Sequence, residues 1–336
     1  MSTVAAELRI DPYEVEVEVV ESSVAARGRA STEALLITLS RVSGLASIPR
    51  TPEIVAALEA PARFYSQFAF ADDGVSGQSI LRITFESRLV LDLIDRAGLP
   101  VWWSRRPSVV AWIVLDNGEP RLLGAGAGHA LTTLMSQRAL FRGLPLEIPL
   151  LDLDDTLRVS ETDVFSKTAE VLEAASTRYG ADLVLTGRVK ERFSIAHGSV
   201  FSGDWEVWVA GQPVAHSFSD LTAVEAANAG IDMVADHLFG TYAVLSRRLV
   251  DYDIAVAGLD GAQSYVALMD YLINLEFVAQ VGVTSVTPRA IQLKVASRAA
   301  FEQFMMLLTH DGLLREDAFH RGPGLQFVWL EGQALN

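Results

Sequence analysis

Apolar and acidic residues alternate near the start of the chain. From Tyr13 to Val19 every second residue is apolar and the residues between them are glutamates, a spacing typical of a strand with one buried face. A helix is predicted next, with Ser22 or Ser23 as its N-cap and Gly44 as its left-handed stop. The following predicted elements are a helix beginning at Thr51-Pro52, strands over Phe64–Phe70 and Ile80–Phe85, and a helix over Leu89–Ala97. We therefore predict a β-α-α-β-β-α module over residues 11–99.

A second module is predicted over residues 108–248. Its first strand, Val109–Leu115, is apolar at every position, which is typical of a strand buried on both faces. Two capping boxes, Ser160–Asp163 and Thr222–Glu225, begin predicted helices. The predicted elements are helices over His129–Arg142, Val164–Tyr179 and from Thr222 to about Leu245, and strands over Leu146–Leu151, Asp182–Val189, Trp205–Val209 and Pro213–Phe218. This order predicts a mixed α/β module.

The last predicted module covers residues 252–332 and has a simpler order. It consists of strand Ile254–Ala257, helix Tyr265–Leu275, strands Val278–Val283 and Ala290–Val295, helix Ala299–Leu308 and strand Gln326–Leu330. The β-α-β-β-α-β order is that of a ferredoxin-like module. The predicted fold class is therefore α+β, built from three small mixed α/β modules.

Composition narrows the function classes. The 336 residues include 42 acidic and 27 basic ones, and the net charge of −15 repels phosphate backbones, so we expect no nucleic-acid partner. The absence of cysteine excludes disulfides, thiolate nucleophiles and cysteine-ligated zinc. Charged residues or glycine interrupt every long apolar run, and residues 1–10 do not have the pattern of a signal peptide, so we expect no transmembrane segment and no export of the chain as written. Homo-oligomerisation stays open.

No catalytic motif stands out. Three glycines, at positions 124, 126 and 128, precede a predicted helix, but their spacing matches no phosphate-binding fingerprint and no lysine lies near them. The histidines include no i, i+4 pair, and no serine has the context of a nucleophile elbow. We predict no catalytic residue and no cofactor.

Asp152 and Asp154 lie in an acidic stretch after a predicted strand. With His129 they are the candidate metal ligands, because divalent cations bind where several such side chains converge. The turn glycine and distal glutamate of a calcium loop are missing, so a solvated acidic loop is the favoured interpretation. The alternative function is a small-ligand or divalent-metal-binding enzyme with a site assembled between domains, which requires a deep polar cleft at these residues.

An aromatic and basic cluster joins the first two modules. It consists of Trp102, Trp103, Arg105 and Arg106, and prolines bracket it. Because such a combination stacks on sugar rings or anchors a partner, these four are candidate interaction residues. Buried tryptophans also lock the joints between domains, and we favour an inter-domain seam here.

Several segments resemble one family of uncharacterised bacterial proteins. They are Tyr13–Val17, Ala34–Gly44, Gly98–Trp102, Arg106-Pro107, Leu144–Leu146, Leu151–Asp154, Arg178–Arg188 and Trp205. The family is that of domain of unknown function 2066, and the resemblance extends over almost the whole chain. It implies a periplasmic envelope protein, with a cytoplasmic location as the alternative. The middle portion is also similar to the TolB amino-terminal domain and to curli-secretion and flagellar-ring accessory proteins.

From these observations we expect a non-enzymatic interaction or assembly factor of the cell envelope. Its sheet edges and aromatic surfaces would bind other envelope proteins as partners.

Overall fold

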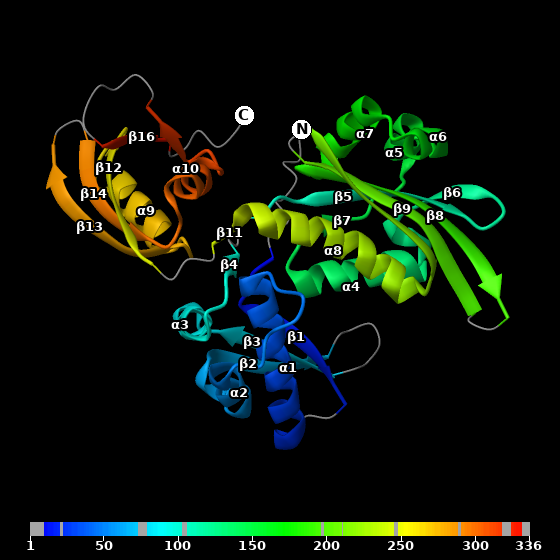
Figure 1. Ribbon diagram of the computed structural model, residues 1–336, viewed down its shortest axis with the longest axis horizontal. Coiled ribbons are helices and arrows are strands. Elements are labelled where there is room, and N and C mark those ends of the chain that lie inside the picture. The colour runs from blue at the N-terminus through cyan, green and yellow to red at the C-terminus, as the bar shows by residue number, and fades with distance from the viewer. Residues whose placement is uncertain are drawn as a thin grey trace.

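The computed structural model describes residues 10–20, 23–72, 79–102, 106–195, 198–209, 211–244, 248–287, 290–317 and 324–330. The fold is α+β, as predicted, with helices packed on antiparallel and mixed sheets (Figure 1). Buried apolar residues gather in separate cores within residues 15–101, 102–238 and 244–329. These cores define an N-terminal, a middle and a C-terminal module. Among the described residues, no helix combines the length and the apolar character that crossing a bilayer requires.

The N-terminal module has a three-stranded antiparallel sheet in the order β1-β3-β2, with helices over one face. Its elements are β1 (Glu14–Val19), α1 (Val24–Ser43), α2 (Pro52–Glu59), η1 (Pro61–Arg63), β2 (Tyr65–Asp72), β3 (Ser79–Phe85) and α3 (Ser87–Ala97). The predicted alternation of β1 is confirmed, because its valines are buried and its glutamates exposed. Ser23 caps α1 by accepting a hydrogen bond from the Ala26 N–H, and Gly44 ends the helix at φ 72°. Local sequence signals therefore define this module well.

The middle module is a sheet in the order β10-β9-β8-β5-β6, with β7 also paired to β5. Its elements are β5 (Val109–Asp116), β6 (Pro120–Leu123), η2 (Ala125–Ala127), α4 (Ala130–Arg142), β7 (Leu146–Glu147), α5 (Leu153–Arg158), α6 (Glu161–Ser166), α7 (Ala169–Ser176), η3 (Thr177–Tyr179), β8 (Leu183–Ser194), β9 (Gly198–Val209), β10 (Gln212–Leu221) and α8 (Ala223–Tyr242). Helices α4 and α8 lie on one side of the sheet and α5 to α7 on the other (Figure 1). As predicted, β5 is buried on both faces.

Trp205 fills the core between β9 and α8. Its side chain is fully buried, and its indole N–H donates to the Ala226 carbonyl at 2.9 Å. A Cβ added at Gly187 would lie 2.2 Å from the indole, and one added at Gly230 would lie 2.9 Å from it. Two glycines on neighbouring elements thus provide the room that this ring occupies.

Two predicted elements of the middle module differ in the structure. The strand expected over Leu146–Leu151 is only the two-residue β7, because Pro149 has no N–H with which to continue a ladder. The helix expected over Val164–Tyr179 is divided between α6 and α7 at Lys167, whose φ is 54°. Both capping boxes are confirmed, at Ser160 for α6 and at Thr222 for α8.

The C-terminal module has a five-stranded sheet in the order β13-β14-β12-β16-β15. Its elements are β12 (Val250–Ala257), α9 (Ala262–Ile273), β13 (Val278–Val286), β14 (Ala290–Ser297), α10 (Phe301–Thr309), β15 (Leu314–Glu316) and β16 (Leu325–Trp329). The predicted β-α-β-β-α-β order is present with one addition. The three-residue β15 follows α10 at the sheet edge, and β16 turns back from it to lie parallel to β12. A single helical crossover from β14 would make the last strand parallel to β14. Because β15 intervenes, β16 instead runs antiparallel to β14.

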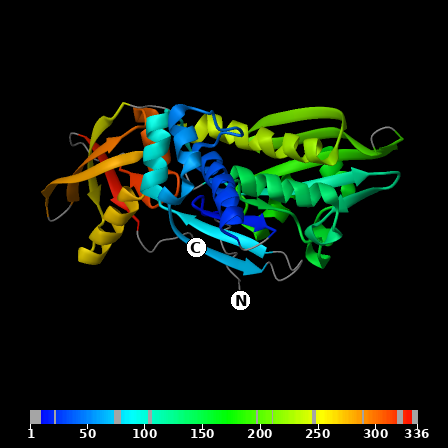
Figure 2. The same cartoon turned by 90° about the horizontal axis from the view of Figure 1, so that it is seen from below.

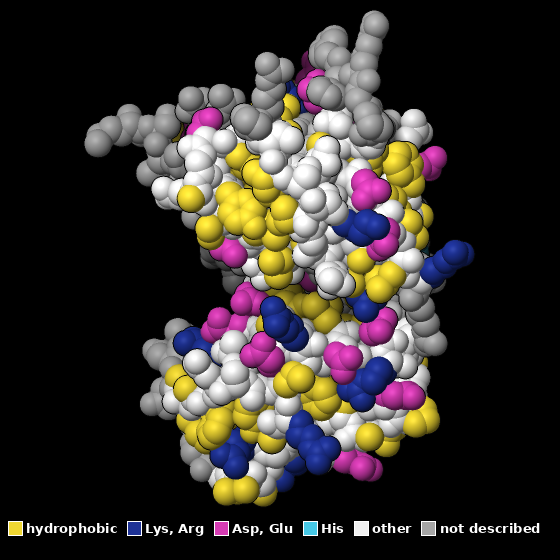
Figure 3. Space-filling view, turned by 90° about the vertical axis from the view of Figure 1, so that its left-hand side faces the viewer, with side chains coloured by type: hydrophobic (Ala, Val, Ile, Leu, Met, Phe, Trp, Pro, Cys, Tyr) yellow, Lys and Arg dark blue, Asp and Glu magenta, His cyan; other side chains and the backbone are white. Residues whose placement is uncertain are grey.

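The modules meet around a short two-stranded pairing. Strand β4 (Val101–Trp102), where the chain leaves the N-terminal module, pairs antiparallel with β11 (Ala243–Val244), where it leaves the middle module. The N-terminal module lies against the junction of the other two (Figures 1 and 2). Seen from the side of the C-terminal module, the surface narrows between two modules, and charged side chains of both signs lie along this waist (Figure 3). An ion pair of 3.2 Å between Arg298 and Asp95 links the C-terminal module to α3.

Candidate functional site

Three leucines around α5 point into solvent. Leu150, Leu153 and Leu157 are 61%, 75% and 76% exposed, and the last two share one face of α5 because they are four residues apart. We call these three residues the leucine face. Phe165 in α6 is also 60% exposed. Single exposed apolar residues are ordinary, but several large ones on one short segment are typical of an interaction surface.

A buried carboxylate holds α5 in place. The Asp155 side chain is fully buried and accepts hydrogen bonds from the Leu151 N–H at 2.9 Å, from Arg178 at 3.0 Å and from the Tyr179 hydroxyl. Arg178 also forms a two-pronged contact of 2.7 and 2.8 Å with Asp152, which caps α5. Because α5 is attached through these polar contacts on its inner side, its leucines remain on the outside.

The electrostatics of this anchor favour its charged form. Hydrogen bonds from Arg178 are the main reason that the pKa of Asp152 lies well below its ordinary value. Burial, together with the hydrogen bond to Asp155, raises the pKa of Tyr179 to about 12. Around neutral pH the anchor therefore contains a charged carboxylate–guanidinium pair and a neutral phenol.

Backbone strain brackets the same segment. Leu151 and Lys167 both have a φ of 54°, and they are two of the three non-glycine residues with positive φ in the described part of the chain. A left-handed conformation costs an L-residue roughly 1–2 kcal/mol. Residues held in this way cluster at functional segments. The strain at both ends of the segment therefore marks α5 and α6 as a candidate functional segment.

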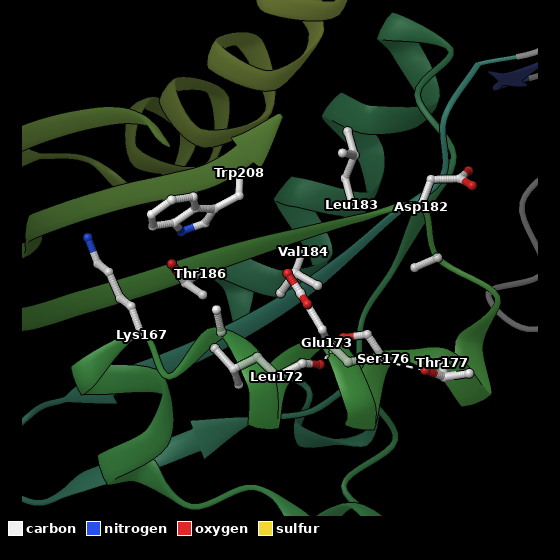
Figure 4. Close-up of a pocket in the computed structure, with 12 residues that line it drawn as sticks. Lys167, Leu172, Glu173, Ser176, Thr177, Asp182, Leu183, Val184, Thr186 and Trp208 are labelled. Carbon is white, nitrogen blue, oxygen red and sulfur yellow. Dashed lines mark hydrogen bonds between the residues drawn. The ribbon is translucent and has the colours of Figure 1, made fainter. Parts of the chain in front are cut away.

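A groove of about 140 Å³ lies between α7 and the strands β8 and β9 (Figure 4). We call it the α7 groove. Among its lining residues are Lys167, Leu172, Glu173, Val184, Thr186 and Trp208. The indole of Trp208 forms one wall and is 41% exposed, and the Glu173 side chain extends from α7 toward the strands (Figure 4).

Negative charge dominates the α5–α7 layer. Residues 147–182 contain nine carboxylates and three cations. Each cation is already paired: Arg158 with Asp154, Arg178 with Asp152 and Asp155, and Lys167 with Asp204 at 2.9 Å and Glu206 at 2.5 Å. The layer therefore presents a negative field around the leucine face, which attracts cationic partners.

The structure does not bring the candidate metal ligands together. Asp152 and Asp154 both contact Arg178, at 2.7 and 3.5 Å. His129 lies on the opposite side of the sheet, where its Nδ1 caps α4 by accepting from the Leu131 N–H at 3.2 Å. No group of three metal-ligating side chains suited to an ion is found within the described ranges.

Two of the candidate interaction residues form a seam between modules. Trp102 is 1% exposed and packs edge-on against Phe239 of α8. The Arg106 guanidinium lies 4.0 Å from the Trp102 ring and donates to backbone carbonyls of Arg41 and Gly143. This pair thus lies between modules, and the Trp102 ring is buried there and not on the surface. Trp103 and Arg105 lie outside the described residues.

Buried arginines extend this seam. Arg142 of α4 is fully buried and contacts Asp232 at 2.5 Å, Asp236 at 2.6 Å and the Gly44 carbonyl at 3.1 Å. Burial lowers the pKa of Arg106 to about 9, which still leaves this guanidinium charged at neutral pH. The seam therefore contains buried cations that contact carboxylates and backbone carbonyls.

Replacing Arg178 with methionine is expected to release α5. The substitution removes the contacts to Asp152 and Asp155, so we expect hydrogen-exchange protection of the α5 amides to fall at neutral pH while the sheet stays protected. In the wild type the same loss should come with acid. The lowered pKa of Asp152 gives stability that is present above its ordinary value of 3.8 and is lost as the pH falls through the folded value.

Arg158→Met is the matched control for this experiment. Within the described residues Arg158 forms an ion pair only with Asp154, at 3.1 Å, and its side chain is 56% exposed. Its replacement should leave protection nearly unchanged. Equal protection of α5 in both variants would show that Arg178 does not hold the helix.

Sequence reasoning missed the leucine face. The predicted strand Leu146–Leu151 includes Leu150, and a solvated loop is the favoured interpretation of the aspartates after it. The signal that was present is the four-residue spacing of Leu153 and Leu157 within an acidic segment. The sequence likewise predicts for Trp208 only that it lies in a strand.

Comparison with known proteins gives a match to a domain family. The model of a domain of unknown function, DUF8605, matches residues 6–103. A search of curated proteins finds no match. The matched residues cover the N-terminal module and end within the seam, so they do not include the α5–α7 layer. An uncharacterised domain family is thus supported for the N-terminal module, and the resemblance to domain of unknown function 2066 stays a prediction.

Proposed function

We propose that this protein is a non-enzymatic binding protein that docks a cationic amphipathic segment of another protein on the leucine face. The observation that supports this most is the exposure of Leu150, Leu153 and Leu157 on a segment that is anchored from beneath. An amphipathic helix recognised in this way places its apolar face on the leucines. Its cations would face the surrounding carboxylates.

The energetics favour such a partner over solvent. Burying a leucine side chain contributes roughly 1.5–3 kcal/mol. Because the anchor at Asp155 holds α5 in place before binding, little ordering of α5 opposes association. The excess of carboxylates in residues 147–182 speeds the approach of a cationic segment and disfavours an acidic one.

The setting of this function is also a proposal. The resemblance to domain of unknown function 2066 and to envelope accessory modules supports a periplasmic assembly factor whose partners are other envelope proteins. Fractionation of cells expressing the native gene tests the location. Recovery in the cytoplasmic fraction alone would remove the envelope part of the proposal and leave the docking part intact.

Peptide binding tests the docking function. The probe is a synthetic amphipathic helix of leucine and lysine, with a leucine–glutamine helix for comparison, and fluorescence anisotropy measures the affinity. We expect the double substitution Leu153→Ser and Leu157→Ser to weaken binding of the lysine peptide by at least about tenfold, because two apolar contacts are lost.

The control is Leu140→Ser on the opposite side of the same module. Leu140 lies on α4 and is 52% exposed, so its substitution should leave the affinity unchanged. Binding that the double substitution does not alter, or equal binding of the uncharged peptide at low salt, would contradict the proposed function.

A further inference from the structure

We infer that the α7 groove is a specificity pocket for one lysine or arginine side chain of the docked segment. This inference rests on the proposed function and adds a chemical requirement to it. The size of the groove is the first argument. Pockets that enclose small molecules or cofactors usually measure roughly 300–1,000 Å³, whereas this groove has about 140 Å³. A cavity of ~150 Å³ holds one benzene ring, so the α7 groove has room for a single side chain.

The walls have the chemistry that a long cationic side chain needs. Leu172 and Val184 provide an apolar lining for its methylene stem. The Trp208 indole provides an aromatic face for its charged end, and Glu173 provides a carboxylate (Figure 4). Lys167, the cation in the lining, does not oppose this, because Asp204 and Glu206 neutralise it.

Both recognition groups are free of other partners in the described part of the chain. None of the ring contacts and cation–π contacts there involves Trp208, although its neighbours on β9 and α6 do have such contacts. No ion pair or side-chain hydrogen bond joins the Glu173 carboxylate to another described residue. An aromatic face and an unpaired carboxylate that line the same groove are what a cation–π and salt-bridge site requires.

The groove is placed to act together with the leucine face. Helix α7 supplies one wall of the groove, and α5, which carries two of the leucines, lies beside α7 in the same layer (Figure 1). The inference requires that a segment docked on the leucines directs one side chain past α7 toward Trp208. Lysine and arginine share the required charge and stem, and the test separates them.

Small amides test the groove without any peptide. The probes are Nα-acetyl-lysine methylamide and Nα-acetyl-arginine methylamide, with the norleucine analogue as the uncharged comparison. Titration followed by ¹H–¹⁵N NMR should give saturable shifts of the Trp208 indole N–H, assigned with Trp208→Phe, and of α7 amides. We expect Glu173→Gln to weaken the binding of the preferred cation by about tenfold. Glu170→Gln, which makes the same charge change on α7 at a position outside the groove lining, should leave it unchanged.

The outcomes separate this inference from the proposed function. Equal shifts with the norleucine amide, or an affinity that Glu173→Gln does not change, would contradict the cation specificity of the α7 groove. This holds even if substitution of Leu153 and Leu157 weakens binding of the leucine–lysine peptide. Conversely, the lysine or arginine amide can shift the Trp208 indole signal as expected while the double substitution in the leucine face leaves the peptide affinity unchanged. In that result the groove stands as a cation site, and the docking function fails.

Discussion

Replacing Trp205 with alanine should lower the free energy of unfolding of the middle module by roughly 3–5 kcal/mol. The ring is fully buried, stacks on Phe218 with centroids 6.0 Å apart, and donates its N–H to the Ala226 carbonyl. Its removal leaves a cavity between Gly187 and Gly230, which have no side chains with which to fill it. Urea unfolding followed by far-UV circular dichroism measures the effect.

Trp208→Ala is the matched control, three residues along the same strand. Its side chain is 41% exposed and faces the α7 groove, so its removal should change stability by less than about 1 kcal/mol. If the two substitutions destabilised the module equally, the assignment of Trp205 as the centre of this core would be wrong.

The second large effect is expected at the seam. Arg142→Met should cost about 3 kcal/mol, the lower end of the range for breaking a buried ion pair. The lower end applies because Asp232 keeps its contact with Arg138 at 2.8 Å and Asp236 is 67% exposed. The Gly44 carbonyl at the end of α1 loses its donor as well. Contact between the N-terminal and middle modules should therefore loosen.

Limited proteolysis and thermal unfolding measure this change. Cleavage should become faster between the two modules, and the unfolding temperature should fall. Arg138→Met is the control: it removes a cation from the same carboxylate, but the Arg138 side chain is 20% exposed and, among the described carboxylates, bonds only Asp232. If Arg138→Met lowered the unfolding temperature as much as Arg142→Met, the stabilisation would come from the contacts with Asp232 and not from the contact between Arg142 and Gly44.

Local signals explain how much of the fold could be predicted. Ser23, Gly44 and the two capping boxes act within a few residues, so the helix ends they define were predicted closely. The alternation in β1 likewise predicts one buried face, and the continuous apolar run of β5 predicts burial on both faces. The short pairings β4–β11 and β15–β16 were missed, because two or three residues carry no period and their partners are distant in the chain.

The candidate site was harder to predict for a related reason. Charge and composition identified the acidic stretch, but not that Arg178 would neutralise part of it from 26 residues away. Asp152 and Asp154 contact Arg178, and His129 caps α4 on the opposite side of the sheet, so the three candidate ligands do not meet. Exposure of an apolar side chain is a property of the whole fold, so the leucine face became visible only when the position of α5 was known.

The pairing of β4 with β11 also has a mechanical meaning. The two strands run antiparallel at the point where the chain enters and leaves the middle module, so they form a clasp across the base of that module. Because Val101 pairs with Val244, tension between the N-terminal and C-terminal modules would pull both strands from the same end and would open the two residue pairs one after the other. The clasp, the contact of Arg142 with Gly44 and the ion pair of Arg298 with Asp95 would share that load before the leucine face was disturbed.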